Sequence, residues 1–282
     1  MILTPHLEPA GPPLISPQNY EFLRDHIYRE SGIVLENGKH YLLGARLMPI
    51  VARRQLGDLD ELCSLMKATG EYPLRREVVE AMTTNETQFF RDIDVWEGLR
   101  TQVLPELTER HKATRILRLW SAASSSGQEA YSLAILLLEM GLGDWAIQIV
   151  GTDLSEPMLE QARRGKYKQM EVSRGLPTKY LVKHFTRRGV EWELNEAARR
   201  LVRFQQLDLR GTLSGLGPFD LVMCRNVLIY FDVPTKKSIL QRIRGTLHRK
   251  GYLILGSAET TLNLDNTFKR QSVGRTTFYT AP

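Results

Sequence analysis

The sequence predicts an α/β protein: a doubly wound, Rossmann-like parallel sheet with an inserted β-subdomain, preceded by a small all-helical domain. An apolar segment at 116–120 runs into seven small residues, 121–127, and then into an apolar helix at 130–140. Two further apolar segments, 146–152 and 221–224, also end at polar residues and precede helices. Apolar strands that alternate with helices are typical of a parallel sheet with helices on its faces.

Residues 17–82 are predicted to form the all-helical domain. Pro17 follows the potential cap Ser16 and opens a first helix that ends at Gly32. Three more helices are expected at about 39–55, 59–69 and 73–81. Residues 1–16 contain four prolines and no basic signal-peptide segment, so we expect a disordered tail there.

The second of these helices carries a basic row. Lys39, Arg46 and Arg53 are spaced seven residues apart, so they line up along the helix beside an apolar stripe. Pro49 can kink the helix and disturb this alignment.

Residues 83–112 are expected to link the two domains through a polar segment and a helix. The segment at 82–91 is dense in hydrogen-bonding side chains and contains the pair Phe89 and Phe90, which is unusual for a plain linker. The helix is expected at about 94–111, where Pro105 can bend it. Residues 113–282 then form the sheet domain.

The small residues at 121–127 indicate a ligand-binding turn. Small side chains let the backbone approach a ligand, and the following helix presents unpaired N–H groups. Gly127 is the one glycine present, so the spacing is not G-x-G-x-x-G. This argues against NAD and leaves room for S-adenosylmethionine (SAM), which has no pyrophosphate.

SAM carries an ammonium, a carboxylate and a sulfonium, so its site needs both an acid and a cation. Glu129, near the helix start, is the candidate for the ammonium, and Arg91 is the candidate for the carboxylate. The alternative for Glu129 is an ordinary first-turn acid favoured by the helix dipole. Asp153 lies 26 residues after Gly127, at the end of the second strand, where an acid can bind both ribose hydroxyls.

Residues 171–204 interrupt the alternation, and we interpret them as the inserted β-subdomain. A short helix at 178–185 is followed by two polar, alternating segments, 190–194 and 201–204. Residues 160–203 contain twelve Lys/Arg and five Asp/Glu, in a chain with a net charge of +6. This local excess indicates either an acidic partner or a solvated face.

The remaining elements complete the sheet. A third strand at 202–207 precedes Asp208, and the strand at 221–224 precedes Asn226, which would point into the crevice beyond the strand ends. The last elements are a helix at 234–249, a strand at 251–255, and a closing hairpin of 268–273 and 276–280.

Other chemistries lack their motifs. The chain has no P-loop and no G-x-S-x-G elbow, and its six histidines show no metal-ligand spacing. No apolar run is long enough to span a membrane, and Cys63 and Cys224 lie in different elements. We expect a reduced, cytoplasmic protein that binds no metal.

Four motifs together resemble one family. They are TNETQFFR at 84–91, WSAASSSGQEAYS at 120–132, GTDLS at 151–155 and CRNVLIYFD at 224–232. Their combination is similar to the bacterial chemotaxis receptor methyltransferases of the CheR type. The resemblance extends over about residues 17–280 and includes the helical domain and the inserted β-subdomain.

The resemblance implies methyl transfer from SAM to glutamate side chains of chemoreceptors, which yields γ-glutamyl methyl esters and S-adenosylhomocysteine (SAH). It assigns Arg91 and Tyr230 to the catalytic pair that steers the substrate. It assigns SAM contacts to Asn85, Thr87, Arg91, Glu129, Asp153, Asp208, Leu209, Asn226 and Val227.

The resemblance also implies partners. The row Lys39, Arg46 and Arg53 would contact acidic receptor helices, with solvated charge as the alternative. The β-subdomain can bind a receptor C-terminal pentapeptide in this family, depending on a loop near 187–190. We expect a monomer that acts on the cytoplasmic domains of chemoreceptors, without nucleic acid and without membrane insertion.

Two departures from the family pattern are visible. Gln128 and Ala130 stand where the family often has Glu and Pro, while Glu129 remains. Asp208 stands where Asn is frequent, and an ionised aspartate can accept a hydrogen bond from the adenine amino group but cannot donate one.

Two alternative functions remain open at this point. A nucleic-acid methyltransferase would account for the basic insert, but the N/D-P-P-Y/F signature of amino-methylating enzymes is absent. A SAM-binding receptor adaptor without activity would keep the cofactor site, but Arg91, Glu129, Asp153 and Tyr230 are all intact.

Overall fold

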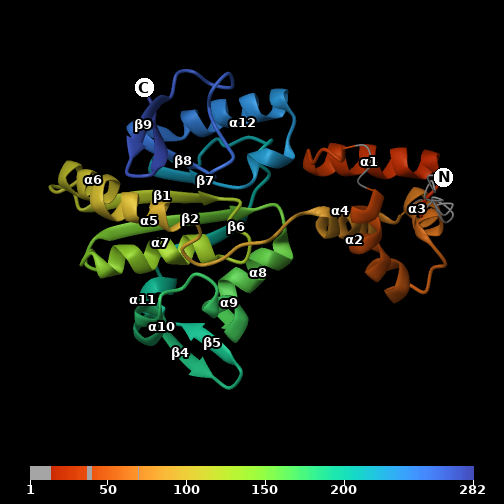
Figure 1. Cartoon of the computed structure of the whole chain (residues 1–282), viewed down its shortest axis with the longest axis horizontal. Coiled ribbons are helices and arrows are strands. Elements are labelled where there is room, and N and C mark those ends of the chain that lie inside the picture. The colour runs from red at the N-terminus through yellow and green to blue at the C-terminus, as the bar shows by residue number, and fades with distance from the viewer. Residues whose placement is uncertain (1–13, 37–39, 69) are drawn as a thin grey trace, which may run out of the picture. The chain divides into compact units, whose positions relative to one another are not determined.

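The computed structural model describes residues 14–36, 40–68 and 70–282. The chain forms two compact units, residues 1–83 and 84–282 (Figure 1). Most of the predicted tail at 1–16, and Lys39 of the basic row, lie outside the described residues. No helix in the described part of the chain is long and apolar enough to cross a membrane.

The first unit is a helical domain, as predicted. Asp58 caps the third helix by accepting a 2.8 Å hydrogen bond from Glu61 N–H, and Gly32 ends the first with φ 74°. Leu23, Leu43 and Leu62 are fully buried in its core. The helices are α1 (Pro17–Ser31), α2 (His40–Arg53), α3 (Leu59–Lys67) and α4 (Tyr72–Met82).

The second unit contains a seven-stranded sheet in the order β6-β2-β1-β7-β8-β10-β9. The first five strands pair in parallel, whereas β10 pairs antiparallel with β8 and β9. This is the predicted doubly wound sheet with a closing hairpin. The strands are β1 (Ile116–Ala122), β2 (Ala146–Asp153), β6 (Val202–Gln206), β7 (Phe219–Cys224), β8 (Leu247–Leu255), β9 (Lys269–Val273) and β10 (Thr276–Thr280).

Helices cover both faces of this sheet. Figure 1 shows α12 (Val233–Gly245) on one face and α7 (Gln128–Glu139) with α8 (Glu156–Arg164) on the other. Alternate residues of β1 pack on opposite faces of the sheet, because successive side chains of a strand point to opposite sides. Leu119 packs in the core beneath α7, and Trp120 packs in the core beneath α12.

The inserted β-subdomain is present, but its strands differ from the prediction. A three-stranded antiparallel sheet, β3-β5-β4, is formed by β3 (Lys166–Lys168), β4 (Phe185–Arg188) and β5 (Glu191–Leu194). The predicted insert strand at 201–204 is wrong, because these residues belong to β6 of the main sheet. Short polar strands such as β4, with Phe185 as its single buried residue, give little periodic signal.

Short helices complete the insert and the approach to β1. The insert contains α9 (Gln169–Ser173) and α10 (Thr178–His184), and α11 (Glu196–Arg199) leads into β6. The helix predicted at 94–111 is divided into α5 (Ile93–Gly98), the π-helical η1 (Leu99–Val103) and α6 (Leu104–Arg110). The helix predicted at 234–249 ends at Gly245, so β8 begins four residues earlier than expected.

The segment at 84–92 is not a flexible linker but part of the core. Phe89 is fully buried and its ring meets those of Tyr167 and Phe185, with centroids 5.0 and 5.6 Å away. Phe90 N–H donates to Ser132 Oγ of α7 at 3.0 Å. These contacts fix the polar side chains of 85–91 against the sheet domain.

Candidate functional site

The site lies where β2, β1 and β7 end side by side. In the register of these strands Ala122 faces Thr152 on one side and Cys224 on the other. The residues that follow each strand therefore meet at one edge, as expected for the ligand crevice of an open α/β sheet. They are the turn at 121–127, Asp153, and the loop at 225–230.

The turn is held in a left-handed backbone conformation that favours glycine. Ala123 and Ser125 have φ of 61° and 49° although neither is glycine. Ser124 N–H donates to Thr152 O at 2.8 Å, and Ser125 Oγ donates to Asn85 O at 2.8 Å. The second bond ties the segment at 85–91 to the turn.

Gly127 is needed for packing as well as for its φ of 92°. A Cβ at this position would lie 2.9 Å from Ala162 Cβ and 3.0 Å from the Phe204 ring. The glycine that looked like a ligand contact in the sequence therefore also lets α7 start close to α8 and β6.

Asp153 organises the turn. Its Oδ2 accepts from Ser125 N–H at 2.8 Å and its Oδ1 accepts from Ser155 N–H at 2.9 Å. Burial raises the pKa of its carboxyl group above the usual 3.8, against the lowering effect of these backbone hydrogen bonds. Each oxygen keeps a lone pair, so the predicted contact with ribose hydroxyls is compatible with this arrangement.

Glu129 is paired inside the protein. Its Oε1 accepts from Ser121 Oγ at 2.8 Å and its Oε2 accepts from Arg225 Nη1 at 3.0 Å. Burial raises the pKa of Glu129, and the Arg225 charge and the Ser121 hydrogen bond oppose that rise. Arg225 therefore stabilises the ionised acid that an ammonium group would need.

Arg225 is the functional residue that the sequence reasoning missed at the centre of the site. It is 6 % exposed, and besides Glu129 its guanidinium pairs with Asp92 Oδ2 at 2.7 Å and donates to Arg91 O at 3.0 Å. A charged residue directly after a buried strand was the available signal. It joins the strand end of β7 to both α7 and the 84–92 segment.

Arg91 remains accessible beside this network. Its main-chain carbonyl also accepts from Trp96 Nε1 at 2.9 Å, so its backbone is fixed from two sides. Within the described residues its guanidinium makes one long hydrogen bond, from Nη1 to Glu86 O at 3.4 Å. The backbone of Arg91 is thus fixed by Arg225 and Trp96, and most of the donors of its guanidinium are available.

The loop at 225–230 carries Asn226, Val227 and Tyr230. Asn226 has φ 58°, and Tyr230 ends the short 3-10 helix η2 (Leu228–Tyr230). Consecutive backbone N–H groups of this loop point at the Glu259 carboxylate, with distances of 2.8 Å for Asn226 and 2.9 Å for Val227. The sequence analysis did not identify Glu259 either. The signal that could have indicated it is an acid placed soon after the end of β8, just as Asp153 stands at the end of β2.

Asp208 and Leu209 follow β6 on the other side of the turn. Leu209 is buried in the core beneath α12. Arg210 Nε lies 3.1 Å from each Asp208 oxygen, and Arg210 Nη2 lies 2.7 Å from Oδ2. The carboxylate is therefore held as an ion pair, a feature that an asparagine at this position would not share.

The basic row of the helical unit is internally engaged. Arg46 Nη1 donates to the carbonyl oxygens of Met82 and Thr83, and Arg53 pairs with Glu77. The structure gives the two described members of the row different roles: Arg46 holds the end of α4, and Arg53 forms an exposed ion pair.

A cleft of about 590 Å³ lies beside the loop at 225–230. Its lining includes Asp92 and Glu259 from the network described above, and Arg270 and Arg275 from the closing hairpin.

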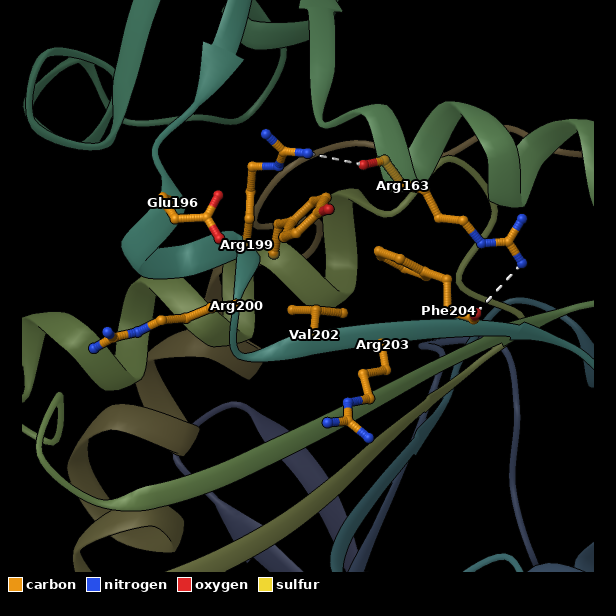
Figure 2. A pocket seen from close by; sticks show the side chains of 8 residues that line it. Arg163, Glu196, Arg199, Arg200, Val202, Arg203 and Phe204 are labelled. Atoms are coloured by element: carbon orange, nitrogen blue, oxygen red, sulfur yellow. Dashed lines mark hydrogen bonds between the residues drawn. The ribbon is translucent and has the colours of Figure 1, made fainter.

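A second hollow, of about 460 Å³, contains much of the positive charge of the basic region. Figure 2 shows the guanidinium groups of Arg200 and Arg203 pointing apart, with Arg203 on the opposite side of β6 from Val202. Arg163 and Arg199 are each bonded to a main-chain carbonyl at 3.3 Å. These arginines therefore do not converge on a single anion.

The residues at the strand ends fit SAM. An acid supported by a cation, a second buried acid and an accessible arginine match its ammonium, ribose and carboxylate. Two buried polar atoms, Ser124 Oγ and Arg225 Nε, have no hydrogen-bond partner within the described residues. Ser124 lies in the turn itself, where a ligand can supply the partner.

Comparison with known proteins agrees with this geometry. Residues 85–277 match the family model described as the CheR methyltransferase SAM binding domain, and residues 18–83 match the CheR methyltransferase all-alpha domain. The SAM-dependent chemistry of the sheet domain is thereby established, with SAM as the cofactor.

Curated relatives match almost the whole chain. Chemotaxis protein methyltransferase 1 of Pseudomonas aeruginosa is 42% identical over 257 residues, which cover 89% of this chain and 93% of the relative. Chemotaxis protein methyltransferase Cher2 of Pseudomonas putida is 39% identical over the same shares. The chemotaxis protein methyltransferase of Vibrio parahaemolyticus is 37% identical over 90% of this chain and 94% of the relative. The chain belongs to the CheR methyltransferase family.

Proposed function

We propose that this methyltransferase esterifies glutamate side chains in the cytoplasmic domains of chemoreceptors, producing γ-glutamyl methyl esters. The names of the relatives place them in chemotaxis. The observation that supports the chemistry is the guanidinium of Arg91, which makes one long internal hydrogen bond among the described residues and whose backbone is bonded to Arg225 beside Glu129. A glutamate carboxylate is a ligand that such a guanidinium can hold by charge-assisted bonds.

The residues of the site suit a carboxylate nucleophile. A glutamate side chain is ionised at neutral pH, so no strong general base is required. Bound SAM supplies an electrophilic methyl group. Glu129 would hold the ammonium end of the cofactor, Asp153 would hold its ribose, and residues of the 225–230 loop would complete the site. The protein then has to align the substrate oxygen with the methyl group and remove its water.

Arg91 and Tyr230 are the proposed catalytic pair. Arg91 comes from the segment before the sheet domain and Tyr230 from the end of η2, so the two approach the crevice from different segments. Arg91 cannot hold the SAM carboxylate and the substrate carboxylate at full strength together. We propose that it positions the substrate and that Tyr230 orients the same carboxylate.

The first experiment identifies the product. The protein is incubated with methyl-labelled SAM and receptor cytoplasmic fragments, and the label is tested for release by base. Base-labile label on the receptor supports the ester. Base-stable label on the receptor contradicts the ester, label on added nucleic acid supports the nucleic-acid alternative, and SAM binding without any transfer supports an inactive adaptor.

The second experiment tests Arg91. Arg91→Ala is expected to abolish measurable receptor methylation, because the variant loses the charge that positions the carboxylate. SAH affinity of the same variant separates the two roles: unchanged affinity assigns Arg91 to the substrate, and lost affinity assigns it to the cofactor. Near-normal turnover would contradict the assignment to either role.

Partner contacts extend the proposal. Among the described residues strand β4 pairs with β5 alone, so its other edge is available to a receptor C-terminal pentapeptide by strand addition. Receptor fragments with and without this pentapeptide would show equal methylation if the loop at Gly189 and Val190 does not bind it. We propose a cytoplasmic monomer that reaches the receptor through this subdomain and through Arg53, whose exposed pair with Glu77 can exchange for a receptor acid.

A further inference from the structure

We propose that Glu259 is a positioning residue for methyl transfer: its carboxylate fixes the 226–229 backbone so that Asn226 and Tyr230 face the reacting groups. The inference rests on the proposed function, because it assumes that this loop borders the SAM site. It concerns a residue outside the four motifs that identify the family resemblance.

The Glu259 carboxylate gathers five backbone N–H groups. Oε1 accepts from Val227, Leu228 and Ile229 at 2.9, 2.7 and 3.3 Å. Oε2 accepts from Asn226 and Gly256 at 2.8 and 2.7 Å. Successive N–H groups that converge in this way form an anion-binding concavity, and here the anion comes from the chain itself.

These hydrogen bonds stabilise a loop whose conformation is unfavourable by itself. Asn226 has φ 58°, and the four amides at 226–229 follow a strand that has ended, so no sheet partner is left for them. Charge-assisted bonds to one carboxylate can satisfy all four amides and hold the loop in one shape.

Gly256 lies directly against the Glu259 carboxylate and Asn226. A Cβ added to Gly256 would lie 2.7 Å from Glu259 Oε2, 2.8 Å from Asn226 Nδ2 and 2.9 Å from Asn226 N. Gly256 does not have a positive φ, so alanine is compatible with its backbone. Gly256→Ala therefore displaces the carboxylate or the asparagine without altering any charge.

The role of Glu259 is indirect. Within the described residues its carboxylate accepts hydrogen bonds from backbone N–H groups and from no side chain of the site. It would act on the cofactor and the substrate through Asn226, Val227 and Tyr230. A residue of this kind should change the binding of SAM and the rate of transfer together, because both depend on one loop.

The test uses the full chain and three variants. Glu259→Gln keeps the shape of the side chain, but either orientation of its amide places an NH2 against at least two of the five N–H donors. Gly256→Ala perturbs the same contact by size. Asp94→Asn is the matched control, because it removes a carboxylate from the same cleft without contacting the loop.

Four quantities are measured for each variant: the Kd for SAH by calorimetry, the KM for SAM, kcat, and amide hydrogen exchange of the peptide that covers 226–229. Glu259→Gln and Gly256→Ala are expected to weaken SAH binding by about 10- to 100-fold, as unsatisfied buried donors would. Both should lower kcat at saturating SAM and speed exchange in the loop. Asp94→Asn should leave all four quantities within about twofold of the wild type.

Two results would overturn the inference. The first is SAH affinity and kcat within about twofold of the wild type in both Glu259→Gln and Gly256→Ala. The second is a lower melting temperature with unchanged Kd, KM and kcat, which would make Glu259 a stability residue only. Asn226→Ala separates this failure from a failure of the proposed site: if that variant binds SAH normally, the loop does not belong to the cofactor site at all.

Discussion

The turn at 121–127 and the loop at 225–230 are both irregular segments that follow a strand, but carboxylates stabilise their backbones to different extents. Both follow a buried parallel strand, both contain a non-glycine residue with positive φ, and both are held by a carboxylate from a neighbouring strand end. In the turn, Asp153 accepts two backbone N–H groups and keeps capacity for a ligand. Glu259 accepts four N–H groups from the loop and a fifth from Gly256. The first acid supports the backbone and can also accept hydrogen bonds from a ligand, whereas the second, in the part of the chain that the structure describes, accepts hydrogen bonds from the backbone alone.

The two regions also differ in the size of their side chains. The turn consists of small residues, so the backbone itself forms most of its surface. The loop carries Asn226, Val227 and Tyr230, so its backbone has to be fixed from behind for these side chains to be placed. Arg225 connects the regions through its bonds to Glu129 and Arg91 O.

The largest change in the free energy of unfolding is expected from removing Arg225, which connects the turn to the loop. Arg225→Ala leaves the buried Glu129 and the neighbouring Asp92 without their cation. Removing one partner of a buried ion pair costs about 3–5 kcal/mol, so the free energy of unfolding should fall by that order. Urea denaturation measures it, and Arg225→Met shows whether restoring side-chain volume recovers the loss. A fall below about 1 kcal/mol would show that the pair is not buried in solution.

Asp153→Asn tests the turn alone. The amide group presents an NH2 either to Ser125 N–H or to Ser155 N–H, and the ribose contact loses its charge. We expect SAH affinity to fall by about 100-fold, with hydrogen exchange of residues 226–229 unchanged. Faster exchange in the loop as well would mean that the two regions are a single cooperative unit.

The pH dependence of stability and of SAH affinity tests the two acids of the turn region, Glu129 and Asp153. Burial raises the pKa of Glu129 above 4.5 and that of Asp153 above 3.8, so folding favours their protonated forms. The stability that each contributes is complete below its unfolded pKa and is lost as pH rises through the folded pKa. An ammonium ligand favours ionised Glu129, so SAH affinity should increase with pH through that raised pKa and then level off.

Calorimetric titration of SAH at several pH values would show this increase. Glu129→Gln should flatten the profile and weaken binding at neutral pH. Asp153→Asn should retain the part that belongs to Glu129. A profile in Glu129→Gln identical to that of the wild type would remove Glu129 from the ammonium site.

The smallest effect is expected in the helical unit. Arg53→Gln breaks an exposed pair with Glu77, and such pairs contribute less than about 1 kcal/mol to stability. Unfolding should therefore be nearly unchanged, while the Kd for a receptor fragment should rise at low salt if Arg53 contacts receptor acids. Glu77→Gln frees the same guanidinium and should lower that Kd. Equal affinities in both variants would assign the basic row to solvated charge.

Much of the architecture follows from local patterns. The apolar strands 116–120, 146–152 and 221–224 are predictable because a strand buried on both faces is a continuous apolar run. The helices of the first unit are predictable from caps such as Asp58 and from Gly32. Strand β4 and the boundary between the insert and the main sheet were not predictable from the sequence, because short polar strands depend on pairing with residues distant in sequence.

The sequence by itself determined which chemical groups reach the strand ends: the small turn, Glu129, Asp153, Asn226 and the segment at 85–91. These are short local patterns, and parallel strands bring their ends to one edge of the sheet. Only the tertiary structure decided how the charges are paired. Arg225 reaches Glu129 across 96 positions and Glu259 reaches Val227 across 32. Such contacts depend on strand order and on burial, neither of which is visible in the spacing of residues along the chain.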